Sequence, residues 1–377
     1  MRRLWLLFVP AAAYQCLAII AAMRQRRKQG HRSRPRQFFQ PGISVLKPVH
    51  GLDPNTRAAF ISQVRQNYPA FEILFGVTSE HDGAIAEIER LKSAYPDAAI
   101  RLAVAKVTAA NPKVGVLIEL SRHARYPIWV VNDGDIKVTD TYLAEIVTPL
   151  ADLDVGLVTC AYRASAHSAA TAWEALGIAT DFMPSALVAQ LLGVRDFGFG
   201  STLAFRAEDL EAAGGFAAVA EYLADDYQLA RHLTATGKRA VLSTYVVETS
   251  LGEGTWRGVW NHQLRWARTI RVSKAGYAGL PFAHAGLWAV LAILVGARIP
   301  AAALVVLRVT SAFATGWLVL RSSVAKRFAW LAPVWDLYAF AIWLTSYAGN
   351  RVQWRDRLIS IDRDGCIVAS DASDSSC

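Results

Sequence analysis

Charged residues are scarce in this 377-residue sequence, since Asp, Glu, Lys and Arg together make up only 19% of it. Soluble globular domains usually contain about a quarter charged residues. Hydrophobic residues make up 53%, which excludes a disordered or collagen-like chain and favours membrane segments attached to a folded domain. The length leaves room for one large domain or two ordinary ones.

Several signatures of reactive sites are also missing. The four cysteines are far apart and form no CxxC pair, which argues against a disulfide scaffold or a zinc ribbon. No P-loop, HExxH motif or Ser-His-Asp order is present, which argues against hydrolysis by those routes.

The N-terminal region predicts a membrane helix. Leu4–Met23 is a run of 20 residues without a charge, and at about 1.5 Å per residue it spans a hydrocarbon core of roughly 30 Å. A buried helix or a cleaved signal peptide is the alternative. The next stretch, Arg24–Arg36, contains seven Lys or Arg and no acid, so the positive-inside rule places it in the cytoplasm. This share of the net charge of +9 suits anionic lipid better than nucleic acid.

Apolar segments return near the C-terminus, at 282–296, 301–320 and 329–348. The third contains Asp336 and several aromatic residues, so it either spans the membrane, re-enters it or lies flat on it. The tail after Asn350 is expected to form a small hairpin around Asp362–Gly365, on the cytoplasmic side.

The middle of the chain, from Gly42 to about Ser250, predicts an α/β domain. Strands are expected at 43–46, 72–77, 100–104 and 128–131, and helices at 55–66 and 84–94. Such alternation indicates a mostly parallel sheet with helices on both faces. Ligands bind beyond the carboxyl ends of the strands in such sheets, so polar residues that follow strands are the candidates for a site.

Four polar clusters have this placement: Ser79–Asp82, Asn111–Lys113, Asn132–Asp135 and Ala224–Tyr227. Each alone is typical of a turn or a helix cap. Asp133 and Asp135 are two residues apart after an apolar strand, and in an extended segment both side chains point the same way. Two such carboxylates suit Mg²⁺ or Mn²⁺ bridging a diphosphate. Asp226, a separate carboxylate, could then act as a general base.

The segment Trp256–Arg271 predicts an amphipathic helix. One face carries apolar side chains, and these are Val259, Trp260, Leu264, Ala267 and Ile270. Arg265 projects from the opposite side. We expect an interfacial helix with its apolar face in lipid, and an ordinary basic surface helix is the alternative.

Short motifs follow one another in a characteristic order from Ile43 to about Arg271. They are SVLKP (Ser44–Pro48) followed by Gly51, Asp53 and Pro54, NPK (Asn111–Lys113), VGLV (Val155–Val158), AGGF (Ala213–Phe216) and DDYQLA (Asp225–Ala230). In order and spacing the sequence resembles the membrane glycosyltransferases of the family that contains ceramide glucosyltransferase, glycosyltransferase family 21. Bacterial relatives that glycosylate hopanoids are the most similar, because Gly-Asp follows Asp133 and HQLRW closes the domain.

The resemblance implies an α/β fold of the GT-A type, a Rossmann-like nucleotide-sugar-binding domain with transmembrane helices at both ends. The family pattern is three aspartates followed by a (Gln/Arg)xxArg-Trp motif. Carried over, Asp82 would contact the nucleotide base. Asp133 with Asp135 would hold the metal and the diphosphate, and Asp226 would be the base.

The last motif of the family ends here in Arg265 and Trp266. Its first position is His262, where the pattern has Gln or Arg, and Gln263 comes one place too late to substitute on the same helical face. His262 could donate a hydrogen bond to phosphate or acceptor, or be a packing residue. Lys113 would support the nucleotide.

The resemblance also implies a domain organisation. We expect a transmembrane helix (1–23), a basic cytoplasmic linker (24–41), the GT-A domain (42–250), amphipathic interfacial helices (251–281), two or three membrane segments (282–348) and a C-terminal tail (349–377).

The implied reaction is inverting transfer of a hexose or N-acetylhexosamine from a UDP-sugar to a lipid hydroxyl. UDP-glucose and UDP-N-acetylglucosamine are the expected donors, and a hopanoid or a ceramide-like lipid is the expected acceptor. The apolar stretch Thr171–Phe199 would approach the acceptor. The expected location is a bacterial inner membrane with the catalytic domain in the cytoplasm, and no nucleic-acid partner is expected.

The sequence disfavours three other functions. A processive polysaccharide synthase shares the motif logic but needs a pore of more spanning helices than this sequence predicts. A non-catalytic nucleotide- or lipid-binding membrane protein would not need Asp133, Asp135, Asp226 and Arg265 intact. A transporter would need repeated membrane bundles.

Overall fold

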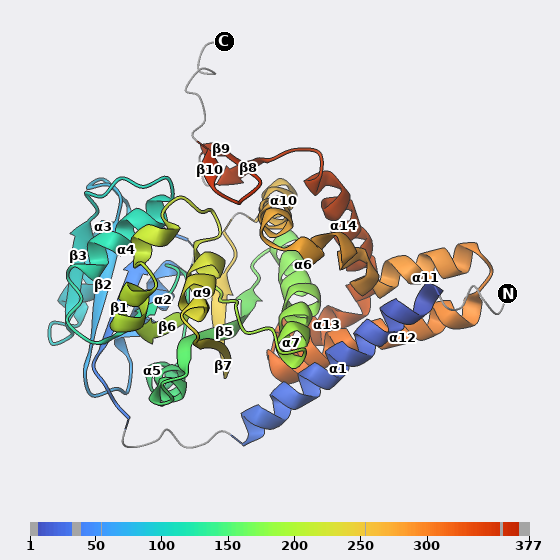
Figure 1. Ribbon diagram of the computed structural model, residues 1–377, viewed down its shortest axis with the longest axis horizontal. Coiled ribbons are helices and arrows are strands. Elements are labelled where there is room, and N and C mark those ends of the chain that lie inside the picture. The colour runs from blue at the N-terminus through green and yellow to red at the C-terminus, as the bar shows by residue number, and fades with distance from the viewer. Residues whose placement is uncertain (1–6, 32–38, 54, 253, 355–356, 369–377) are drawn as a thin grey trace, which may run out of the picture. The chain divides into compact units, whose positions relative to one another are not determined.

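The computed structural model describes residues 7–31, 39–53, 55–252, 254–354 and 357–368. The chain forms two compact units. The sheet unit consists of His31–Tyr162 and Val194–Gly252, and the helical unit consists of Met1–Gly30, Arg163–Gly193 and Glu253–Cys377. Figure 1 shows the elements of each, coloured along the chain.

A seven-stranded sheet organises the sheet unit, in the order β3-β2-β1-β4-β6-β5-β7. The strands are β1 (Ile43–Pro48), β2 (Phe71–Val77), β3 (Ile100–Val104), β4 (Ile128–Val131), β5 (Val155–Ser165), β6 (Leu203–Arg206) and β7 (Arg239–Ser250). The first four in spatial order are parallel, whereas β6 runs antiparallel to both β4 and β5. The four predicted strands are confirmed and pair in parallel, as expected, and β6 adds antiparallel pairs that make the α/β sheet mixed.

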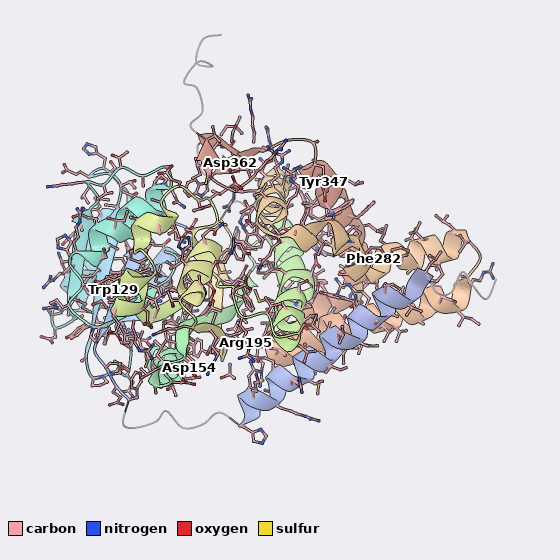
Figure 2. The ribbon with its side chains drawn as sticks, in the orientation of Figure 1. Trp129, Asp154, Arg195, Phe282, Tyr347 and Asp362 are labelled. Atoms are coloured by element: carbon pink, nitrogen blue, oxygen red, sulfur yellow. The ribbon has the colours of Figure 1, made fainter. Side chains whose placement is uncertain are left out.

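The helices of the sheet unit connect its strands and cover the sheet. They are α2 (Thr56–Val64), α3 (Ala84–Ala94), α4 (Pro112–Ser121), α5 (Tyr142–Val147), η2 (Thr148–Ala151), α8 (Ala207–Ala212), η4 (Phe216–Val219) and α9 (Asp225–Ala235). Helix α4 packs closely on β2, because a Cβ at Gly76 would lie only 2.4 Å from Val116 Cγ1. On β4, Trp129, which Figure 2 labels, stacks on Phe216 with 6.0 Å between the ring centroids. Fully buried apolar strands of this kind are typical of parallel sheets.

The helical unit contains the remaining elements. They are α1 (Val9–Gly30), α6 (Ala169–Gly177), η3 (Ile178–Phe182), α7 (Met183–Leu191), α10 (Trp256–Ser273), η5 (Ala275–Ala283), α11 (Ala285–Leu294), α12 (Arg298–Phe313), η6 (Ala314–Val319), α13 (Ser323–Phe328), η7 (Ala329–Leu331) and α14 (Ala332–Ser346), with strands β8 (Arg351–Trp354), β9 (Arg357–Ile361) and β10 (Ile367–Val368). The three strands form an antiparallel sheet. The predicted hairpin is confirmed, and Asp362 closes its turn by accepting hydrogen bonds from the Asp364 and Cys366 amides at 2.9 and 2.8 Å (Figure 2).

Two helices of the described chain are long and apolar enough to cross a membrane, Arg298–Val319 and Ser323–Ser346. A bent pair, Ala275–Ala283 and Ala285–Leu294, meets at 57° and forms either a broken span or a re-entrant loop. Two of the three predicted C-terminal segments therefore have the length and composition of spans, including the one that contains Asp336.

The N-terminal span remains a prediction. Residues 1–6 lie outside the described residues, and α1 is not among the helices that qualify as spans in the described part of the chain. One reason is that α1 continues to Gly30 and so includes basic residues such as Arg27 and Lys28 in its last turn. These residues are helical here, where the sequence predicted the start of a linker.

The environment predicted for α10 is wrong. Its apolar face contacts protein instead of lipid, because Trp260, Leu264 and Ile270 pack with Ala267 in a cluster that includes residues of η5 and α14. The Trp260 and Tyr338 rings meet edge to face at 5.7 Å between centroids. The aromatic residues of α14, read from the sequence as membrane-interface anchors, therefore supply the cover for this face.

Asp336, which made the third apolar segment doubtful, is fully buried and paired with Arg308 of the preceding span. The Arg308 guanidinium donates from Nε and Nη2 to Asp336 at 2.8–3.0 Å, and its Nη1 donates to the Thr180 carbonyl at 2.7 Å. Charged residues inside apolar helices are expensive unless they pair. The pair explains how both helices can carry a charge within an apolar stretch.

Candidate active site

Lys113, Asp133, Asp225 and Asp226 form one group at the carboxyl end of β4, which we call the sheet-edge cluster. The Lys113 ammonium lies 2.9 Å from Asp133 Oδ1 and 3.0 Å from Asp225 Oδ2. Asn111 caps the helix that carries Lys113, accepting hydrogen bonds from the Lys113 and Val114 amides. Three residues predicted from separate motifs, Lys113, Asp133 and Asp226, are thus brought together.

Gly200 connects the two acids on which the predicted chemistry depends. Its amide donates to Asp226 Oδ2 at 2.7 Å, and its carbonyl accepts from the Asp133 amide at 3.1 Å. A side chain has no room there, since a Cβ at Gly200 would lie 2.9 Å from Asp133 Oδ2. Gly200 was not predicted, because an isolated Gly before a short strand has no distinctive sequence pattern.

Burial makes Asp226 an unusually weak acid. Its carboxylate lies at the first turn of α9, next to Asp225. Burial and then the charge of Asp225 raise the pKa of Asp226 to about 6, although Lys113 and the Gly200 amide act in the opposite direction. A carboxylate with a pKa near neutrality is a better general base than an ordinary Asp.

Burial opposes the charge on Lys113, but three carboxylates outweigh it. Asp133, Asp225 and Asp226 together raise the pKa of Lys113, so its ammonium is a permanent cation. A fixed positive charge beside open carboxylates is suited to a nucleotide diphosphate.

Asp133 and Asp135 do not lie in an extended segment, so that part of the prediction is wrong. A turn follows β4, and the Ile136 amide donates to the Asp133 carbonyl at 3.3 Å. The Asp133 side chain is 43% exposed. Asp135 instead accepts hydrogen bonds from the Thr249 hydroxyl and, at 2.9 Å, from the Ser250 amide at the end of β7. The turn is therefore fixed by two residues of β7 that lie more than a hundred positions after Asp135 in the sequence.

The carboxylates of Asp133 and Asp135 nevertheless fit a divalent cation. Burial and then the negative charge of Asp133 raise the pKa of Asp135 to about 6, which a nearby cation would reverse. Among the residues that the structure describes, no group of three or more His, Cys, Asp or Glu side chains could hold a metal. Oxygen ligands from a diphosphate would therefore have to complete the coordination.

Lys47 is a polar residue of the site that the sequence did not single out. It is fully buried on β1 and donates to Asn132 Oδ1 at 2.8 Å and to the Asp133 carbonyl at 2.7 Å. Burial lowers its pKa to about 7, against the attraction of Asp135 and Asp133. The signal was available, because a lysine inside the apolar SVLKP strand needs a buried partner.

Asp82 has a structural environment different from the one its predicted role suggests. Its carboxylate accepts from the Gly51 amide at 3.0 and 3.2 Å and from the Ala84 amide at 2.9 Å, and its side chain is only 4% exposed. These bonds tie the loop after β1 to the start of α3. Contact with a nucleotide base remains a prediction for this residue.

His262, Arg265 and Trp266 lie on α10 in the helical unit. His262 Nδ1 lies 2.5 Å from Glu174 Oε1, and Gln263 Nε2 donates to the same oxygen at 2.9 Å. Gln263, one position later on the helix, reaches the same carboxylate as His262 through its long side chain. Glu174, buried on α6, was not predicted.

Glu174 orients the His262 ring through its contact with Nδ1. A carboxylate accepts hydrogen bonds, so it favours the ring form in which Nδ1 donates to it. The Trp266 ring lies 4.7 Å from the His262 ring and 5.4 Å from the Phe182 ring, measured between centroids. This side of α10 therefore combines one oriented imidazole with aromatic surface.

The apolar stretch predicted to approach the acceptor forms α6, η3 and α7 of the helical unit. Trp173 packs against Trp335 and Tyr338, with ring centroids 5.2 and 5.9 Å apart. Leu192 at its end is 65% exposed. Part of this apolar surface therefore packs against other residues of the helical unit.

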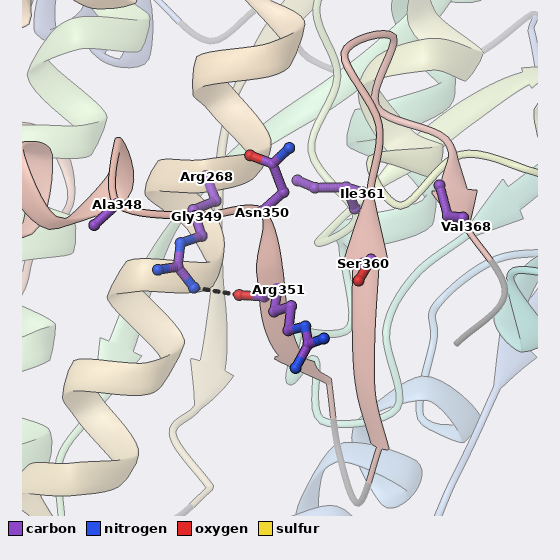
Figure 3. Close-up of a pocket in the computed structure, with 8 residues that line it drawn as sticks. All are labelled: Arg268, Ala348, Gly349, Asn350, Arg351, Ser360, Ile361 and Val368. Carbon is purple, nitrogen blue, oxygen red and sulfur yellow. Dashed lines mark hydrogen bonds between the residues drawn. The ribbon is translucent and has the colours of Figure 1, made fainter. Parts of the chain in front are cut away.

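A pocket of about 600 Å³ lies elsewhere in the helical unit, at the C-terminal end of α10 (Figure 3). Its lining consists of Arg268, Ala348, Gly349, Asn350, Arg351, Ser360, Ile361 and Val368. None of the residues predicted to be catalytic lines it.

Comparisons with known proteins agree on one family. The family model for glycosyl transferase family 21 matches residues 3–367. Ceramide glucosyltransferase 1 of Caenorhabditis elegans is 29% identical over 234 residues, which cover 60% of this chain and 49% of that protein. Ceramide glucosyltransferase 3 of the same organism is 28% identical over 210 residues, 54% of this chain and 45% of that one. The chain thus spans about half the length of these curated relatives.

Solved structures with related folds include the mannosyltransferase PcManGT from Pyrobaculum calidifontis in complex with GDP-Man and Mn²⁺. It is 21% identical, with a TM-score of 0.49 over 90% of this chain and 99% of that one. Another is GalNAc-T7 with UDP, GalNAc and Mn²⁺, 11% identical, with a TM-score of 0.42 over 67% of this chain and 51% of that one.

Proposed function

Because this chain belongs to glycosyl transferase family 21, we propose that it transfers a sugar from a nucleotide sugar to a lipid hydroxyl with inversion at the anomeric carbon. The observation that carries the proposal is the sheet-edge cluster, where the partly buried carboxylate of Asp226, with its raised pKa, adjoins the Lys113 ammonium and the exposed carboxylate of Asp133. The apolar helices of the helical unit suit a lipid acceptor.

The proposed donor is a UDP-hexose or UDP-N-acetylhexosamine. The names of the curated relatives favour glucose and a ceramide-like acceptor. The HQLRW motif favours a hopanoid acceptor instead, and this remains the second proposal. A test of the function measures UDP release by the purified chain, which should require both a UDP-sugar and a lipid. Release that is equally fast without lipid would indicate a hydrolase and contradict the proposal.

In the proposed mechanism Asp226 takes the proton from the acceptor hydroxyl as the oxygen attacks the anomeric carbon. The Lys113 ammonium stabilises the negative charge of the departing diphosphate. The Gly200 amide orients Asp226 by donating a hydrogen bond to it. Asp133 and Asp135 would hold Mg²⁺ or Mn²⁺, which neutralises diphosphate charge when bound. Arg265 and Trp266 are proposed to act on the nucleotide and acceptor, by the family pattern. Asp82 is proposed to contact the base.

We predict that chelation with EDTA stops transfer and that Mn²⁺ or Mg²⁺ restores it. The physical reason is that burial and then the charge of Asp133 raise the pKa of Asp135, and a bound cation would favour its ionised form. Asp133→Asn should lower both activity and the rise in melting temperature that Mn²⁺ causes. Asp97→Asn, which changes an exposed acid, is the matched control. Full activity after exhaustive chelation would show that the pair is structural.

We predict that Glu174→Ala lowers kcat/KM about tenfold, the effect of losing one charge-assisted hydrogen bond that holds a side chain. His262→Gln, which restores the residue of the family pattern, should retain more activity than His262→Ala. Glu119→Ala is the matched control, because Glu119 pairs with His123 on the surface at 3.3 Å. Equal activity of Glu174→Ala and Glu119→Ala would rule out a role for the oriented imidazole.

We propose that the sheet unit lies in the cytoplasm of a bacterial cell and the N-terminus outside. Each Lys or Arg near an anionic leaflet contributes roughly 1 kcal/mol of attraction, and seven follow the first apolar run. A cysteine at Asp97, in a chain whose Cys16, Cys366 and Cys377 are serine, should resist an impermeant thiol reagent in intact cells. Labelling before the cells are broken would reverse the orientation.

A further inference from the structure

The pocket at the end of α10 is lined by arginines that have no acidic partner among the residues the structure describes. Arg268 and Arg351 line it, and Arg271 lies one helical turn from Arg268. None of these three arginines forms an ion pair with any residue in the described part of the chain. The pocket therefore gathers positive charge that the fold leaves uncompensated.

The hydrogen bonds of these arginines leave donors unused. Arg268 donates from Nη1 to the Arg351 carbonyl, as Figure 3 shows, while its buried Nε has no hydrogen-bond partner among the described residues. Arg271 donates to the Gly349 carbonyl at 3.2 Å and to Asn350 Oδ1 at 2.5 Å. Buried donors are nearly always satisfied in folded proteins, so an acceptor is expected at Arg268. Burial and then the charge of Arg271 lower the pKa of Arg268, which an anion would relieve.

The position of the pocket along the chain indicates the source of such an anion. Helix α14, part of a segment apolar enough to cross a membrane, ends at Ser346, two residues before Ala348 of the pocket lining. Tyr347 lies between them, with the Arg271 guanidinium 5.4 Å from its ring centroid. Aromatic and basic residues at the end of a spanning helix lie at the depth of the lipid headgroups.

We propose that this pocket binds the phosphate of an anionic lipid headgroup. Guanidinium groups pair with phosphate oxygens in a planar, two-bonded geometry, which suits Arg268 and Arg351 in the lining. The rest of the lining, which includes Ser360, Ile361 and Val368, is uncharged and would face the glycerol portion. This site is separate from the sheet-edge cluster and does not depend on the proposed transfer reaction.

The test measures binding of short-chain phosphatidylglycerol to the full chain in a neutral detergent, with short-chain phosphatidylcholine and inorganic phosphate as comparison probes. Phosphatidylglycerol should bind more tightly than phosphatidylcholine. Arg268→Gln should weaken its binding about tenfold or more, the usual effect of losing hydrogen bonds to a charged group. Arg351→Gln should do the same while keeping the main-chain carbonyl that Arg268 uses, so it covers the case in which Arg268→Gln fails to fold.

Arg298→Gln is the matched control, since Arg298 is an exposed arginine at the start of α12 and outside the pocket. Competition by inorganic phosphate would support recognition of the phosphate group itself, and phosphatidylglycerol binding without such competition would support a lipid headgroup. Equal affinity for the two lipids would overturn the proposal. So would an unchanged affinity in both pocket variants, or an equal loss in Arg298→Gln.

Discussion

Asp226→Asn should reduce kcat for sugar transfer by about 10²–10⁴-fold, the usual contribution of a general base. The amide keeps the shape of the side chain and its hydrogen bond from the Gly200 amide, which Oδ2 now accepts at 2.7 Å. Binding of the UDP-sugar should stay close to that of the unmodified chain, because Asp226 is distinct from the proposed metal pair. A variant with more than about a tenth of the original kcat would remove Asp226 from the role of base.

The pH profile separates Asp226 from other groups. The base acts when deprotonated, so kcat should fall as the pH drops through about 6, the raised pKa of Asp226, and should level off above it. Asp225→Asn removes one cause of the raised pKa and frees Lys113 from its contact with Asp225. Both changes lower the pKa of Asp226, so the acidic limb should move to lower pH. If the acidic limb of the kcat profile stays at the same pH in Asp225→Asn, the group that titrates there is not Asp226.

Asp336→Asn should destabilise the helical unit by about 3–5 kcal/mol, the typical cost of leaving one partner of a buried ion pair uncompensated. Asp336 is fully buried, and it accepts hydrogen bonds from Arg308 and, at 2.7 Å, from the Gly286 amide. For a unit of this size the melting temperature in detergent should fall by about 6–20 °C, at about 2–4 °C per kcal/mol.

The double variant Arg308→Met with Asp336→Leu tests whether the charge or the packing matters. Replacing both partners of a buried pair by apolar residues is often neutral or stabilising, so most of the lost stability should return. Glu89→Gln breaks an exposed pair with Lys92 and should cost less than about 1 kcal/mol. If Asp336→Asn is as stable as Glu89→Gln, the Arg308–Asp336 pair does not stabilise the packing of the two apolar helices.

The strands of the sheet unit were predictable because β1 and β4 are buried along their whole length, and such strands are mostly short apolar runs. Helix α10 was predictable for a similar reason, since its apolar residues repeat with the period of a helix. That period shows which face is buried but not what covers it. The prediction of lipid was therefore wrong, because the cover comes from Tyr338 and Trp343, far along the chain.

The acids of the candidate site were predictable because each follows a strand or begins a helix. Their environments were not, since these depend on residues distant in sequence. Asp135 is fixed by Thr249 and Ser250, whereas Lys113 connects Asp133 with Asp225. Glu174 was missed because an acid on an apolar helix has no motif, and its pairing with His262 spans 88 positions.

Analysis of the lipid product tests the central claim most directly. The purified chain would be incubated with UDP-glucose or UDP-N-acetylglucosamine and a panel of ceramides and hopanoids, followed by mass spectrometry and determination of the anomeric configuration. One lipid class should gain a single hexose or N-acetylhexosamine in β linkage, because UDP-sugars are α-linked and the reaction inverts. No sugar on any lipid with a folded, metal-loaded protein, or an α-linked product, would contradict the account.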